Sequence, residues 1–132
     1  MSSRWKQRAA AAMLLSLLVL CTACGQGCRH ISKEEALHRM ESPRDLLIVD
    51  VRTREEYEKS HVPGAVLVPI EDIRQGNLDA LPDKNQELLL YCWTGRRSEE
   101  SAVLLAKLGY RNVYEFGGLV DWTGPVEEGR HE

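Results

Sequence analysis

A lone cysteine, Cys92, stands between an apolar run and a loop that contains Gly95. Residues 88–91 have the continuous apolar character of a buried strand, and a helical pattern begins at Ser98. Backbone N–H groups in such a curl, together with the amino end of a helix, form an anion-binding site. The same electrostatic field favours a thiolate over a thiol. This stretch therefore predicts a cysteine nucleophile inside an anion pocket.

Two arginines follow the cysteine within the same stretch. Arg96 and Arg97 carry positive charge and several N–H donors, which suit an oxyanion. No histidine adjoins Cys92 to act as its base, and His61 is the histidine that folding could bring near. We interpret the other histidines as incidental: His30, His38 and His131. The chemistry should therefore suit a leaving group that needs no proton.

Strand and helix patterns alternate along the chain, which predicts a three-layer α/β domain around a parallel sheet. The predicted strands span residues 29–31, 46–49, 66–68, 87–91 and 112–114. The predicted helices begin after Ser32 and continue to Met40, and then span residues 53–59, 70–74, 77–81 and 98–108. A tight turn at Gly117-Gly118 should lead into a final half-helix.

Several motifs, in this order and spacing, make the chain resemble the single-domain rhodanese family of sulfurtransferases. The most similar members are the small periplasmic rhodaneses of the bacterial phage-shock type. The motifs are Asp50-Val51-Arg52, Glu56-Tyr57, the turn at residues 61–65, the loop at residues 92–98, and Gly117-Gly118 with Trp122. The resemblance implies a five-stranded parallel sheet with helices on both faces.

The resemblance also implies a reaction and a set of site residues. The Cys92 thiolate would take a sulfane sulfur from thiosulfate or a persulfide donor, and a thiol or cyanide would accept it. The covalent persulfide would need no metal and no other cofactor. Asp50, Arg52 and His61 would support the site structurally. The loop that binds the substrate would comprise Trp93, Thr94, Gly95, Arg96, Arg97 and Ser98.

Two other functions remain open from the sequence. The same fold could carry a phosphatase or an arsenate reductase, but tyrosine-phosphatase-type loops place five residues between cysteine and arginine. Here four residues separate Cys92 from Arg97, a ring better suited to sulfur. The other alternative is a tethered binding or sulfur-carrier module with little turnover of its own.

The first 23 residues have the features of a secretory signal, with basic residues before an apolar core. We therefore expect an exported protein, periplasmic or membrane-anchored on the extracytoplasmic side. Lipidation at Cys24 is expected, while a soluble form cut after Ala23 and an uncleaved anchor are alternatives. Residues 24–29 would be a tether, residues 30–123 the rhodanese domain and residues 124–132 a flexible tail.

The remaining composition excludes some partners. The formal net charge of the chain is −3, and no stretch is basic enough to indicate nucleic-acid binding. The four cysteines form neither a disulfide framework nor a zinc motif. Cys28 is interpreted as a bystander, with a redox partnership with Cys92 as the alternative.

Overall fold

Five parallel strands form one sheet in the order β1-β5-β4-β2-β3. The computed structural model describes residues 28–129 of the chain. The strands are β1 (Cys28–His30), β2 (Leu46–Asp50), β3 (Val66–Leu67), β4 (Glu87–Cys92) and β5 (Val113–Gly118). The helices are α1 (Lys33–Glu41), α2 (Arg54–Lys59), α3 (Ile70–Gln75), α4 (Arg96–Lys107) and the 3₁₀ turn η1 (Leu119–Asp121). The predicted α/β class and the five-stranded parallel sheet are confirmed.

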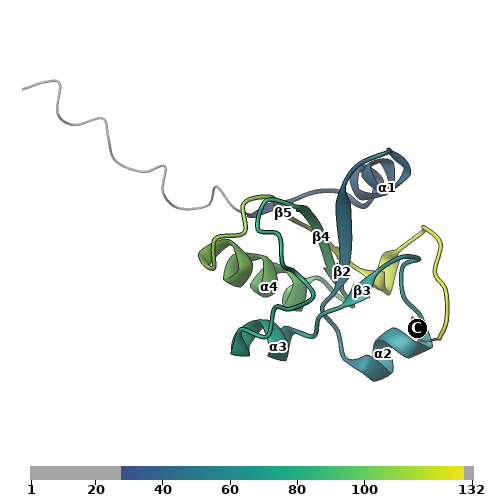
Figure 1. Cartoon of the computed structure of the whole chain (residues 1–132). Coiled ribbons are helices and arrows are strands. Elements are labelled where there is room, and N and C mark those ends of the chain that lie inside the picture. Colours follow the sequence, from purple (N-terminus) through teal and green to yellow (C-terminus); the bar gives the residue numbers. More distant parts are fainter. Residues whose placement is uncertain (1–27, 130–132) are drawn as a thin grey trace, which may run out of the picture.

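Helices cover both faces of the sheet, with α3 and α4 on one side and α1 and α2 on the other (Figure 1). Residues of β4 alternate between the two cores, as the pleat of a strand requires. Leu88, Leu90 and Cys92 face the core under α3 and α4, whereas Leu89 and Tyr91 face the core under α1 and α2. Cys92 is thus the last residue of the central strand β4, and its side chain lies in the core under α3 and α4.

Local capping explains where the helices before the site begin. The Thr53 hydroxyl accepts the Glu56 N–H, and the Glu56 carboxylate accepts the Thr53 N–H, so α2 begins with a complete capping box. The Ser32 hydroxyl accepts the Glu35 N–H at 3.1 Å and starts α1 as the sequence predicts. These caps place both helices directly after their strands.

Three differences from the predicted elements exceed one residue. Residues 77–81 form turns rather than a helix, because Gly76 ends α3 in the left-handed conformation (φ 78°). The helix α4 begins at Arg96 instead of Ser98, so both arginines lie in its first turn. The strand β5 extends through Gly118, so the two glycines end a strand rather than form a turn.

The last described residues, up to Gly129, contact the domain near α2. Glu127 and His61 form an antiparallel bridge with two backbone hydrogen bonds of 2.8 Å. The Gly129 N–H donates to the Glu58 carbonyl at 2.9 Å. The sequence predicts a flexible tail from residue 124, and in this structure Glu127 and Gly129 of that segment contact the domain.

The expected secretory signal and most of the expected tether, including Cys24, lie outside the described residues. Within residues 28–129, no helix is long and apolar enough to cross a membrane. The strand β1 already includes Cys28 and Arg29, which the sequence places in the tether.

Candidate active site

Cys92 ends β4 at the carboxyl edge of the sheet, directly before the loop that leads into α4. Its sulfur accepts the Gly95 N–H at 3.0 Å and lies 3.6 Å from the Ser98 hydroxyl oxygen. The first N–H groups of α4 have no partner within the helix, so its amino end adds a positive field beside the sulfur. The residue is fully buried, so the loop covers the thiol in this conformation. The sulfur thus lies inside a curl of the loop, next to the amino end of α4.

The loop is held close to the end of β5 by glycines. Gly95 adopts φ 107°, a conformation that other residues rarely take, and its backbone faces Gly117. A Cβ added at Gly118 would lie 1.9 Å from the Trp93 carbonyl oxygen. The Val120 N–H donates to that same carbonyl oxygen at 3.0 Å. The glycine pair is therefore needed because the two backbones touch beside Cys92.

Arg97 binds a protein carboxylate rather than an open pocket. Its two terminal nitrogens donate to the two carboxylate oxygens of Glu56 at 2.7 and 3.0 Å, which joins α4 to α2. The hydrogen bonds from Arg97 lower the pKa of Glu56. Arg97 still contributes its positive charge to the neighbourhood of Cys92. Arg96 is exposed and lines a hollow along α4.

Asp50 and Arg52 form a buried ion pair at the carboxyl end of β2. The Arg52 guanidinium donates to both oxygens of Asp50, with a shortest distance of 2.7 Å. It also donates to the Ser60 carbonyl at 2.6 Å and lies over the Tyr91 ring. The pair thus ties the end of β2 to the end of α2, next to the strand that carries Cys92.

His61 is buried on the side of α2. Its ring stacks on Tyr57 with centroids 3.8 Å apart, and its Nδ1 lies 2.8 Å from the Tyr57 carbonyl oxygen. Its Nε2 lies 3.2 Å from a carboxylate oxygen of Glu127. These contacts orient the imidazole toward Glu127 and toward Tyr57 of α2. His61 supports the fold near the site, and the contacts of the Cys92 sulfur lie elsewhere.

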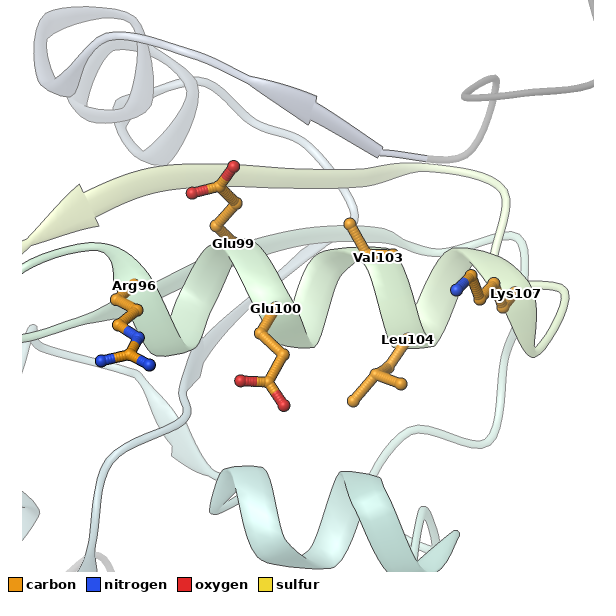
Figure 2. Close-up of a pocket in the computed structure, with 6 residues that line it drawn as sticks. All are labelled: Arg96, Glu99, Glu100, Val103, Leu104 and Lys107. Carbon is orange, nitrogen blue, oxygen red and sulfur yellow. The ribbon is translucent and has the colours of Figure 1, made fainter.

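Trp93 and Thr94, directly after Cys92, are exposed. The Trp93 indole lines a cavity of about 360 Å³ together with Arg52, Glu56, Lys59 and Ser60. A second hollow of about 410 Å³ lies along α4 (Figure 2), where Glu100 and Leu104 point toward α3. The first cavity adjoins the loop of Cys92 and is the better candidate for a substrate.

A buried carboxylate beside the site was missed by the sequence reasoning. Glu115 lies on β5, two residues after the inward Val113, and one of its oxygens lies 3.4 Å from the Ser98 hydroxyl. Its other oxygen contacts His30, which the sequence reasoning set aside as incidental. The alternation of β5 could have revealed Glu115, but the predicted strand ended one residue too early.

Cys28 cannot pair with Cys92 in this fold. Cys28 lies beside Val113 in the sheet, and Val113 lies beside Leu88, four residues before Cys92 on β4. At about 3.3 Å per residue the offset along the strands alone is roughly 13 Å. A disulfide requires Cα atoms within about 7 Å. Both cysteines are free, and the redox alternative for Cys28 is wrong for this conformation.

No cluster of histidine, cysteine, aspartate or glutamate in residues 28–129 has the composition of a metal site. The reactive elements that the structure does bring together are a buried thiol, a loop N–H donor, a helix amino end and a cavity. A parallel five-stranded sheet with this loop after its central strand defines an α/β domain with a candidate cysteine nucleophile at the carboxyl edge of the sheet. The family of Rhodanese-like domains matches residues 32–124, and the chain belongs to it.

Individual relatives handle sulfur or modify RNA. The chain is 37% identical over 81 residues to "Thiosulfate sulfurtransferase PspE" of Escherichia coli, covering 61% of this chain and 78% of the relative. It is 38% identical over 98 residues to "Putative sulfur carrier protein YrkF" of Bacillus subtilis, covering 74% of this chain and 52% of the relative. It is also 31% identical to a tRNA uridine(34) hydroxylase of Yersinia pestis, covering 75% of this chain and 29% of the relative. The chain thus spans about half of the second relative and under a third of the hydroxylase.

Solved structures show the same domain. A rhodanese with anions from E. coli superposes with a TM-score of 0.58 at 36% identity, covering 64% of this chain and 99% of the other. A rhodanese-like domain protein from Staphylococcus aureus superposes with a TM-score of 0.67 at 30% identity, covering 76% of this chain and 97% of the other. The rhodanese resemblance of the sequence is confirmed.

Proposed function

We propose that the chain is a thiosulfate-type sulfurtransferase that works through a persulfide on Cys92. The observation that carries the proposal is the sulfur of Cys92 at the end of β4, which accepts the Gly95 N–H beside the amino end of α4. The Gly95 N–H and the amino end of α4 are already in position, so they can stabilise negative charge on the sulfur without a neighbouring base. Similarity to a thiosulfate sulfurtransferase supports the same reaction.

The first step forms the persulfide. The thiolate of Cys92 attacks the sulfane sulfur of thiosulfate and forms a new S–S bond. The bond between that sulfur and the sulfite group breaks, and its electron pair leaves on sulfite. Sulfite departs as an anion that needs no proton, and the groups that contact the Cys92 sulfur within residues 28–129 are the Gly95 N–H and the Ser98 hydroxyl. Since the thiol is covered here, donor binding requires the loop atoms above it to move.

The second step releases the sulfur. A thiolate or cyanide attacks the outer sulfur of the persulfide, and the electron pair of the broken S–S bond returns to Cys92 as a thiolate. The cavity beside Trp93 offers the Lys59 ammonium to an anionic donor or acceptor. Arg97 supports the pocket through its charge and through Glu56, because its N–H donors already bind that carboxylate. A phosphatase needs such a fork for phosphate, so the engagement of Arg97 disfavours that alternative.

Thiocyanate formation from thiosulfate and cyanide tests the proposal. The full chain should form thiocyanate, and Cys92→Ala should not. Intact-mass analysis after thiosulfate treatment should show one added sulfur atom, lost on addition of cyanide. Equal thiocyanate formation by both proteins would exclude Cys92 as the nucleophile.

A sulfur-carrier role is the second candidate, supported by the similarity to the B. subtilis relative of that description. A carrier would accept sulfur from a protein persulfide and would show little turnover with thiosulfate. Incubation with a persulfidated protein donor, followed by mass analysis of the Cys92 peptide, distinguishes the two. Sulfur on Cys92 from the protein donor alone would favour the carrier.

We also propose that the chain is exported and anchored by lipid at Cys24. The basic and apolar pattern before Cys24 supports this, as does the small residue Ala23. Mass spectrometry of the membrane fraction should find a diacylated Cys24 at the amino terminus of the mature chain. A free amino terminus in the soluble fraction would contradict the lipid anchor.

A further inference from the structure

A buried carboxylate lies behind Cys92, on the opposite side of a single hydroxyl group. The Glu115 side chain is almost fully buried, and one of its oxygens accepts the Gly117 N–H at 3.0 Å. That oxygen lies 3.4 Å from the Ser98 hydroxyl oxygen, which in turn lies 3.6 Å from the Cys92 sulfur. The hydroxyl also donates to the Gly95 carbonyl at 2.9 Å. The carboxylate and the sulfur are therefore electrostatic neighbours.

The second oxygen of Glu115 contacts the imidazole of His30. The two residues are paired across β1 and β5 in the sheet, and the His30 Nδ1 touches the carboxylate. The side chain of His30 is 70% exposed, whereas that of Glu115 is 9% exposed. Glu115 thus connects an imidazole in contact with solvent to the hydroxyl beside the thiol.

Other charged groups near the site have closer partners. Arg97 of α4 interacts electrostatically with Cys92 and donates to the Glu56 carboxylate of α2. Lys33, from the first turn of α1, approaches Gly117 and binds Asp121 of η1 at 2.7 Å. In the described part of the chain, His30 is the ionisable group in direct contact with the Glu115 carboxylate.

Two anions separated by one hydroxyl in a buried site disfavour each other. An ionised Glu115 therefore opposes ionisation of Cys92, unless a positive charge compensates the carboxylate. A protonated His30 supplies that charge, and a neutral His30 does not. The protonation state of the imidazole at the surface thus changes the stability of the buried thiolate.

We propose that Glu115 and His30 act as a positioning pair that sets the pH at which the Cys92 thiol loses its proton. The inference takes Cys92 as the reactive group of the proposed function. It does not require that the sulfur acceptor or donor be known. The carboxylate raises this pH and the protonated imidazole lowers it.

Two substitutions should move the ionisation of Cys92 in opposite directions. Glu115→Gln removes the negative charge and keeps the shape, so the thiolate should form at a lower pH than in the parent chain. His30→Asn removes the group that can carry the compensating charge, so the thiolate should form at a higher pH than in the parent chain. The double variant should behave like Glu115→Gln, because the imidazole acts through the carboxylate.

The measurement is the rate of alkylation of Cys92 by iodoacetamide as a function of pH, followed by mass spectrometry of the Cys92 peptide in the full chain. Counting that peptide separates Cys92 from the other cysteines. His38→Asn on α1 is the matched control, since His38 is a histidine of the same domain outside these contacts. In this variant the pH midpoint of Cys92 alkylation should equal that of the parent chain.

The proposal is supported if the pH midpoint of Cys92 alkylation shifts in opposite directions in Glu115→Gln and His30→Asn. It is overturned if the two midpoints are unchanged or shift in the same direction. His30 is exposed, so His30→Asn should keep its fold and remain informative if Glu115→Gln does not. Alkylation needs no sulfur transfer, so a failed thiocyanate assay would refute the proposed function without affecting this result.

Discussion

At the scale of single residues, the position of Cys92 depends on two backbones that touch. The loop carbonyl of Trp93 lies where a side chain on Gly118 would be, and it accepts the Val120 N–H. Gly95 faces Gly117 on the same side. The loop therefore takes its shape from the end of β5 as much as from its own sequence.

Replacing Gly118 with alanine should displace the loop. The added Cβ would lie 1.9 Å from the Trp93 carbonyl oxygen, a distance that requires the backbone to shift. We expect a loss of sulfur transfer of at least about 100-fold, because an error of about 1 Å in position can cost that much. Thiocyanate formation by the folded variant, verified by circular dichroism, measures the effect.

Gly76→Ala is the matched control for this substitution. Gly76 has φ 78°, and no atom lies within 4 Å of an added Cβ. The control should lose roughly 1 kcal/mol of stability and keep its activity. Full activity in Gly118→Ala would show that the close approach to Trp93 is unimportant for catalysis.

The ion pair of Asp50 and Arg52 is also a residue-scale feature. Both side chains are almost fully buried, so Asp50→Asn would leave the Arg52 guanidinium without its counter-charge. We expect a loss of about 3–5 kcal/mol in the free energy of unfolding, measured with urea. Asp79→Asn in an exposed turn should change it by less than about 0.5 kcal/mol. Equal effects of the two substitutions would contradict a structural role for the pair.

At the scale of elements, α2 and α4 are joined by the pair of Glu56 and Arg97. Glu56 also completes the capping box of α2, so one carboxylate starts its own helix and binds the next. Hydrogen bonds from Arg97 lower the pKa of Glu56, so the folded state favours the ionised carboxylate. This contact between helices should stabilise the pocket wall that Arg52 and Trp93 share with Glu56.

Glu56→Gln tests the pH dependence of that contact. A carboxyl group with a lowered pKa in the folded state stabilises the fold above its unfolded pKa, about 4.3. The stabilisation is lost as the pH falls through the lower folded value. Since the pair is about one-third exposed, the variant should lose roughly 1 kcal/mol at pH 7. The difference between parent and variant should vanish in strong acid.

Urea unfolding at several pH values measures this difference. A gap between the two proteins that stays constant from pH 7 to strong acid would contradict the role of the ionised carboxylate. Glu55→Gln, an exposed neighbour in the first turn of α2, is the control. It should change stability only slightly at any pH, since it lacks the contact with α4.

The elements themselves were largely predictable from the sequence. Apolar runs such as residues 46–49 and 88–91 are typical of strands buried on both faces, and Ser32 and Thr53 are typical helix caps. Contacts between elements were not predictable from spacing. Arg97 and Glu56 lie 41 positions apart, so nothing local in the sequence indicates that the arginine binds a carboxylate.

The missed carboxylate has a different cause. Glu115 stands between apolar residues on a buried strand, where a charged side chain is rare unless it has partners. That rarity was the available signal, and it required the correct end of β5. The hydroxyl of Ser98 and the imidazole of His30 come from other elements, so the connection to Cys92 depends on the sheet order β1-β5-β4.

At the scale of the whole molecule, the carboxyl-terminal segment closes the side of the domain that carries α2. Glu127 and His61 exchange two backbone hydrogen bonds, and Gly129 donates to Glu58. The buried His61 ring stacks on Tyr57, whose hydroxyl donates to the Ala65 carbonyl at 2.6 Å. The end of the chain is thus connected to the core under α1 and α2.

Truncation after Gly124 should therefore destabilise the domain. It removes three backbone hydrogen bonds to His61 and Glu58 and uncovers the His61 imidazole, so the free energy of unfolding should fall by roughly 1–3 kcal/mol. Truncation after Gly129 keeps all three of these hydrogen bonds and is the matched control. Urea unfolding of the full chain and the two truncated chains makes the comparison.

Because the Cys92 loop packs on the end of β5 rather than on this segment, the shorter chain should keep its sulfur-transfer rate wherever it remains folded. Equal stability of all three chains would restore the interpretation of a loose tail.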